Sequence, residues 1–182
     1  MWLTWSQKRG RGMELPHEFY FYTLAQVGIT FAGFATILMA LRESRGGGMS
    51  KFHLWVAKSY IQSGLVTAMN AMLAPLMFGM GLDQIATWRA TSLLIGLPAV
   101  VMLFLAPRQW RQTTDMPVRP RLWVQIVLGL LINGALLFNA AGWPAPPGAG
   151  LVMLAISWNL FGFFVQFAES VSFFFGDEEN TQ

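Results

Sequence analysis

Five long apolar runs, nearly free of charged residues, constrain this chain more than any other feature. The hydrocarbon core of a bilayer is about 30 Å thick, and a helix of about 20 apolar residues crosses it. The five runs are long enough, and they occupy residues 19–41, 52–82, 85–106, 122–143 and 150–175. Backbone polar groups find no partner in hydrocarbon unless they bond to each other, so each run is predicted to be a helix. We therefore predict an all-α integral membrane bundle of five transmembrane helices with no soluble domain.

The composition agrees with a membrane protein. Of the 182 residues, 54% are hydrophobic and 12% are charged, whereas a soluble domain has about 25% charged residues. The chain has no cysteine, which excludes disulfides, thiolate metal sites and cysteine nucleophiles. Its basic residues sit beside the apolar runs, where they serve orientation, so no nucleic-acid partner is predicted.

The basic residues are distributed unequally between the two sides of the predicted bundle. One side collects seven of them: Arg42, Arg45, Lys51, Arg108, Arg111, Arg119 and Arg121. The other side has four: Lys8, Arg9, Arg11 and Arg89. Because cytoplasmic loops carry the excess of Lys and Arg, we expect a cell or inner membrane with the N-terminus outside and the C-terminus in the cytoplasm. A start at Met13 instead of Met1 would strengthen this bias.

Two short tails flank the predicted membrane domain of residues 19–175. The N-terminal tail, residues 1–18, is basic, and the C-terminal tail, residues 176–182, is acidic. Residues 1–12 contain no apolar run, so they do not have the order of regions found in a cleavable signal peptide.

The uncharged part of the third run, residues 85–106, is barely long enough for a span, because it begins only at Ala90. Its extension includes Trp88 and Arg89, which are typical of a membrane–water interface. Between Leu93 and Leu105 the run has no stripe of polar residues. We therefore expect this helix to lie at the periphery of the bundle or against a partner.

Polar residues within the other runs recur at steps of three and four, which places them on one face of each helix. Polar groups are costly in hydrocarbon, so such a face turns away from lipid. The candidate intramembrane polar or ionic site consists of Lys58, Gln62, Asn70, Asn133, Asn159, Gln166 and Glu169. Lys58 and Glu169 are expected at similar depth on antiparallel helices, and we predict that they form an ion pair.

The first run has two neighbouring faces of small or polar residues. One face contains Thr23, Gln26, Thr30 and Gly33, and the other contains Ala25, Gly28, Ala32 and Ala35. Small residues allow helix backbones to approach closely. We therefore predict helix packing at Gly28, Ala32 and Gly33.

The sequence offers no catalytic or cofactor-binding constellation. His17 and His53 fall at opposite ends of their spans, so neither is placed to activate a serine within the membrane. The glycines at 46–48 are not followed by the Gly-Lys-Ser/Thr of a phosphate-binding loop. We predict a chain with no cofactor and no enzymatic activity.

Two functions remain open at this point. The first is a non-enzymatic multi-pass membrane protein that acts by assembly, as a homo-oligomer or as an accessory subunit of a membrane complex. The alternative is a small channel or transporter for a proton, an ion or a small solute, which would use the polar stripe around Glu169.

Overall fold

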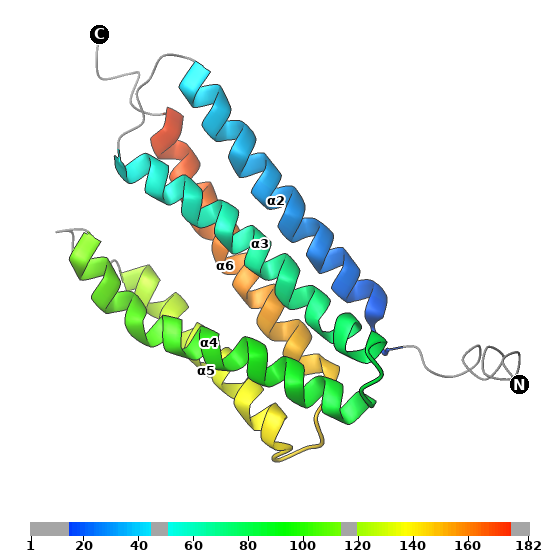
Figure 1. Cartoon of the computed structure of the whole chain (residues 1–182). Helices are drawn as coiled ribbons and strands as arrows, with labels where there is room; N and C mark the ends of the chain where they lie inside the picture. The colour runs from blue at the N-terminus through cyan, green and yellow to red at the C-terminus, as the bar shows by residue number, and fades with distance from the viewer. Residues whose placement is uncertain (1–14, 45–50, 114–119, 176–182) are drawn as a thin grey trace, which may run out of the picture.

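The computed structural model describes residues 15–44, 51–113 and 120–175, and within these ranges the chain is all-α with no strand (Figure 1). The described part contains five helices: α2 (Glu18–Ser44), α3 (Lys51–Gly79), α4 (Gln84–Thr113), α5 (Pro120–Ala141) and α6 (Ala149–Phe175). The prediction of an all-α chain with five helices is confirmed for these residues. Residues 1–14, which include the alternative start at Met13, lie outside them.

The helices form two antiparallel pairs and a fifth helix that contacts both pairs. α2 packs most extensively on α3, α4 packs most extensively on α5, and α6 contacts all four other helices. Figure 1 shows α2 at one edge of the bundle and the α4–α5 pair at the other. None of the other described helices therefore covers one long side of α2.

Two buried clusters hold the bundle together. The larger cluster joins all five helices through residues such as Phe21, Ala71, Trp88, Leu136 and Val152. The smaller cluster lies farther along α2 and joins only α2, α3 and α6. Its members are Phe31, Ala35, Tyr60 and Phe167, and the ring centroid of Phe31 lies 6.2 Å from that of Tyr60 and 5.1 Å from that of Phe167.

Backbone contact between α2 and α3 is possible because both helices place a glycine at the crossing. A Cβ atom built on Gly28 would lie 2.7 Å from the carbonyl oxygen of Gly64, and one built on Gly64 would lie 2.6 Å from that of Gly28. Ala32 and Ala68 flank this crossing and are also buried. Gly33 has open space around it, so of the three residues predicted for packing, Gly28 and Ala32 lie in this contact and Gly33 does not.

The turn between α3 and α4 explains why α3 ends at Gly79, although the apolar run continues to Leu82. The Gly81 N–H donates to the Phe78 carbonyl at 3.0 Å and the Leu82 N–H to the Met77 carbonyl at 3.3 Å. This pair of bonds is a Schellman motif, which requires a left-handed residue at the Gly81 position, and Gly81 has φ of +96°. The Asp83 Oδ1 then accepts the Ala86 N–H at 2.7 Å and caps the start of α4.

The end of α5 follows the same rule, and α5 stops at Ala141 rather than at the predicted Trp143. Gly142 has φ of +76°. The Gly142 N–H donates to the Asn139 carbonyl at 3.2 Å, and the Trp143 N–H donates to the Phe138 carbonyl at 3.1 Å. A glycine in the left-handed conformation therefore closes both of these helices.

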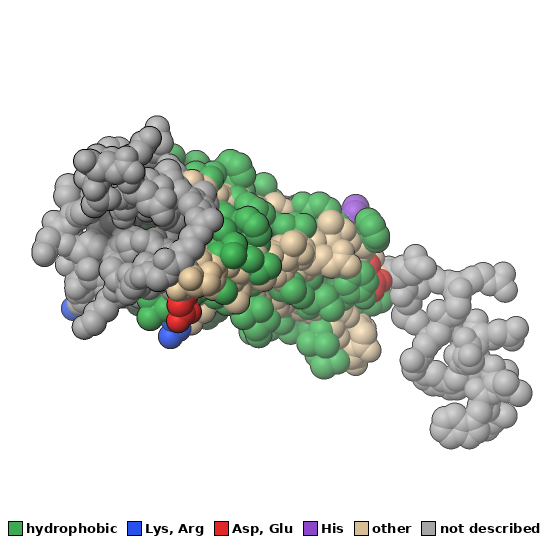
Figure 2. All heavy atoms as spheres, turned by 90° about the horizontal axis from the view of Figure 1, so that it is seen from above, with side chains coloured by type: hydrophobic (Ala, Val, Ile, Leu, Met, Phe, Trp, Pro, Cys, Tyr) green, Lys and Arg blue, Asp and Glu red, His purple; other side chains and the backbone are tan. Residues whose placement is uncertain are grey.

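Four helices of the described chain are long and apolar enough to cross a membrane. Their apolar segments are Glu18–Leu41, Ala57–Gly79, Gln84–Leu105 and Trp123–Ala141. α6 contributes the shorter apolar segment Ala149–Val165. Hydrophobic side chains cover the middle of the face seen in Figure 2, and the charged side chains visible there lie near its two ends.

We predict that Gly28→Ala destabilises the protein by about 1–3 kcal/mol, because its methyl group would overlap backbone atoms of α3. The matched control is Gly134→Ala, since a Cβ atom there meets nothing within 4 Å and alanine favours a helix by about 1 kcal/mol over glycine. Thermal unfolding in detergent should show a lower midpoint for Gly28→Ala and an unchanged or higher one for Gly134→Ala. Equal midpoints for the two variants would contradict the close α2–α3 crossing.

Candidate functional site

A partly buried polar contact joins α5 to α6. Asn133 is fully buried, and its Nδ2 donates to the Gly129 carbonyl at 2.8 Å and to the Asn159 Oδ1 at 3.4 Å. The Asn159 Nδ2 donates to the Asn133 Oδ1 at 3.5 Å. The two side-chain amides therefore satisfy one another, each as donor and as acceptor. Of the predicted site residues, the structure brings these two together.

A second buried amide fixes the loop between α5 and α6. The Asn139 Nδ2 donates to the Ser92 Oγ on α4 at 2.8 Å and to the Gly148 carbonyl at 3.1 Å, and the Asn139 Oδ1 accepts the Gly148 N–H at 3.0 Å. One side chain thus connects α4, the end of α5 and the residue before α6. The contact with Ser92 follows from the fold, because Ser92 is 47 residues away from Asn139 in the sequence.

The predicted peripheral position of the third span is wrong for the first half of α4, although α4 lies with α5 at one edge of the bundle (Figure 1). α4 packs closely along α5, and its first half carries a buried stripe that the sequence analysis missed: Thr87, Trp88, Thr91, Ser92 and Ile95. These residues recur at steps of three and four, as on one face of a helix, but most of them precede Leu93, the first residue of the part that has no polar stripe. Beyond Gly96, no described residue of α4 is buried.

Trp88 is buried inside the bundle, although its residue type had suggested an exposed anchor at the membrane–water interface. Its side chain is 1% exposed, and its ring centroid lies 5.8 Å from that of Phe21 on α2. The Trp88 Nε1 and the Thr91 Oγ1 have no hydrogen-bond partner among the described residues. Trp88 thus contributes apolar area to the core, whereas Arg89, the next residue, is exposed.

The predicted site residues of α3 lie at the surface or close to it. Lys58 and Gln62 are exposed and Asn70 is half-buried. The buried polar residue of this helix is Thr67, whose hydroxyl donates to the Ser63 carbonyl one turn earlier at 2.9 Å. A hydroxyl satisfied by its own helix needs no partner from another element.

Gln166 and Glu169 lie within α6, but their side chains are outside the described part of the structure. The ion pair between Lys58 and Glu169 therefore stays a prediction. The structure brings Asn133 and Asn159 together, and among the described residues no hydrogen bond joins Lys58, Gln62 or Asn70 to either of them. The seven predicted residues do not form one continuous described site.

Among the described residues, no group of three or more His, Cys, Asp and Glu side chains could hold a metal ion. Comparison of the chain with protein-family models, with curated proteins and with solved structures finds no match. We therefore infer the function from the geometry of this chain alone.

We predict that Asn133 and Asn159 are energetically coupled. In a double-mutant cycle with Asn133→Leu and Asn159→Leu, the coupling free energy should be about 0.6 kcal/mol and at most about 1.7 kcal/mol, the range for hydrogen bonds between membrane helices. Asn133→Leu combined with Gln62→Leu serves as the control cycle, because the described parts of α3 and α5 do not contact each other. Coupling no larger than in this control, measured by unfolding in detergent, would contradict the amide pair.

Proposed function

We propose that this chain is an integral membrane protein with five spans that works, without catalysis, by assembling with other membrane chains. The observation that carries the proposal is the apolar outer surface of the bundle. In the four long apolar segments, only 28–33% of the residues are buried inside the chain. Most residues of these segments are therefore half-buried or exposed, and the large apolar side chains among them need lipid or protein as a neighbour.

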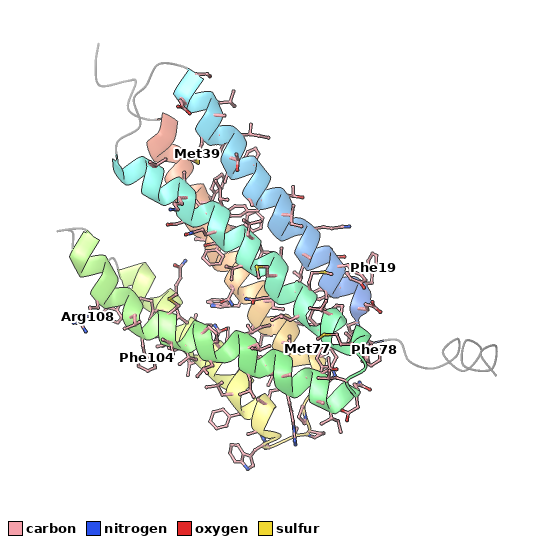
Figure 3. All side chains as sticks on the ribbon, viewed as in Figure 1. Phe19, Met39, Met77, Phe78, Phe104 and Arg108 are labelled. Carbon is pink, nitrogen blue, oxygen red and sulfur yellow. The ribbon has the colours of Figure 1, made fainter. Side chains whose placement is uncertain are left out.

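Exposed apolar side chains occur on every described helix. Examples are Ile37 on α2, Met69 on α3, Phe104 on α4 and Leu131 on α5, which are 57%, 69%, 69% and 65% exposed. Figure 3 shows Phe104 directed away from the neighbouring helices. Soluble monomers rarely expose continuous apolar patches above a few hundred Å², whereas such a belt suits the hydrocarbon of a bilayer.

The positions of the basic residues support five crossings and one orientation. Arg42 is in the last turn of α2, Lys51 begins α3, Arg108 and Arg111 are near the end of α4, and Arg121 is near the start of α5. These helix ends lie at the same side of the bundle as the C-terminal end of α6 (Figure 1). By the positive-inside rule this side is cytoplasmic, and α6 then crosses to it as the fifth span.

The polar contacts favour assembly over a solute path through one chain. Asn133 was a candidate to line such a path, but both Asn133 and Asn139 are buried and bonded to groups of the same chain. The channel or transporter alternative would need the polar side chains of α5 and α6 to be open to a solute. Helix packing instead accounts for the hydrogen bonds that these two residues make.

We expect the C-terminus in the cytoplasm and the α5–α6 loop outside. A reporter that is active only in the cytoplasm, fused after Gln182, should be active in a bacterial host, and a reporter active only outside should be inactive there. The same pair of reporters fused within the α5–α6 loop, after Ala145, should give the reverse result. Exterior activity at Gln182, or release of the chain from membranes by alkaline carbonate, would contradict the five-span model.

We also expect the chain to be found in a complex. After extraction into lipid nanodiscs, the protein mass of the particle should exceed that of one 20.3 kDa chain, as measured by native mass spectrometry. Particles that contain a single chain at every protein concentration tested would contradict assembly.

A further inference from the structure

The side of α2 that faces away from the bundle carries a regular seam. We define the α2 outer face as Phe19, Thr23, Gln26, Thr30, Gly33, Ile37 and Ala40, all of which are exposed. These positions alternate steps of four and three residues, which is the spacing that keeps one seam of a helix against a partner helix in a coiled coil. Figure 3 shows Phe19, 84% exposed, pointing away from the bundle at one end of this face.

The α2 outer face lies opposite the face that packs on α3. Gln26 and Thr30 are each two residues from Gly28, which is about 200° around a helix of 3.6 residues per turn. The Gly28–Gly64 crossing therefore fixes the outer face in an outward position. α2 can pack on α3 and present the outer face to another molecule at the same time.

Most of the exposed uncharged polar side chains of the described spans lie on α2. Four are on α2 (Thr23, Gln26, Thr30 and Thr36), one is on α3 (Gln62), and one is the first residue of α4 (Gln84). The hydroxyls of Thr23 and Thr36 donate to carbonyls of their own helix. Gln26 and Thr30 make no hydrogen bond to any residue that the structure describes, and both lie within the apolar segment Glu18–Leu41.

We propose that the α2 outer face binds the same face of a second copy of this chain, a proposal that rests on the proposed function of membrane assembly. A primary amide both donates and accepts, so Gln26 can bond to the partner's Gln26 across a two-fold axis. Two-fold contacts need a surface that is complementary to itself, and a polar residue within an otherwise apolar or small seam fixes the register of such pairs.

The membrane determines the direction of the two helices. Both copies insert with the same orientation, so the two α2 helices run parallel around an axis perpendicular to the bilayer. Gly33 has nothing within 4 Å of a built Cβ atom, which leaves room for a close approach one turn beyond Thr30. Lipid tails would leave the Gln26 amide unbonded, which is costly in hydrocarbon, whereas a second copy supplies both a donor and an acceptor.

Cysteine cross-linking tests this interface directly, because the native chain contains no cysteine. In isolated membranes treated with copper phenanthroline, Thr30→Cys should form a covalent dimer, since residues on the seam of a parallel pair approach their own symmetry mates. The control is Leu131→Cys on α5, because Leu131 is 65% exposed and, like Thr30, is near the middle of its helix. Leu131→Cys should remain largely monomeric under the same treatment.

Two further variants measure the amide contact and the close approach. Gln26→Leu should weaken dimerisation in lipid about 3- to 20-fold, the equivalent of one hydrogen bond between membrane helices. Gln62→Leu, which removes another exposed amide, should leave the dimer unchanged. Gly33→Ile should block the close approach and lower the dimer fraction without lowering the thermal stability of the monomer.

The outcomes separate this inference from the proposed function. A membrane-embedded chain whose Thr30→Cys variant cross-links no better than Leu131→Cys would overturn the α2 interface and leave membrane assembly standing. A different polypeptide cross-linked at Thr30→Cys in place of a second copy would also overturn it. Release of the chain by alkaline carbonate would instead overturn the proposed function itself.

Discussion

The backbone contact between Gly28 and Gly64 sets the arrangement on which the rest of the structure depends. With no side chain on either residue, α2 and α3 approach until a carbonyl of one helix lies against the Cα of the other. This close approach brings Phe31 of α2 against Tyr60 of α3, and Phe167 of α6 completes that cluster. It also fixes the rotation of α2, so that Gln26 and Thr30 face away from the bundle.

The polar groups inside the bundle and those on its surface have different partners. The amides of Asn133, Asn139 and Asn159 are bonded to groups of the same chain and hold α4, α5 and α6 together. The polar side chains on the outer side of α2 either donate to carbonyls of their own helix, as Thr23 and Thr36 do, or have no hydrogen-bond partner among the described residues. This contrast is why we interpret the first set as packing and the second as a contact surface.

Much of the fold could be predicted from the sequence, because the length and spacing of apolar residues determine helices directly. The predicted end of the second span at Leu82 differed from the structure because apolarity alone does not stop a helix, whereas the left-handed Gly81 does. Trp88 was predicted to be an anchor at the membrane–water interface and is buried instead, because the residue type indicates only where tryptophan occurs most often in membrane proteins. Burial of Trp88 depends on Phe21 of α2, which is 67 positions away in the sequence.

The sequence by itself determined that this chain forms long apolar helices with small and polar stripes, since these properties depend on neighbours three or four residues apart. Only the tertiary structure decided which stripe faces which helix. Of the two stripes on α2, the one with Gly28 packs on α3 and the one with Gly33 stays exposed. Both contain small residues at helical spacing, so the choice depends on a residue of another helix, Gly64 of α3, against which Gly28 packs.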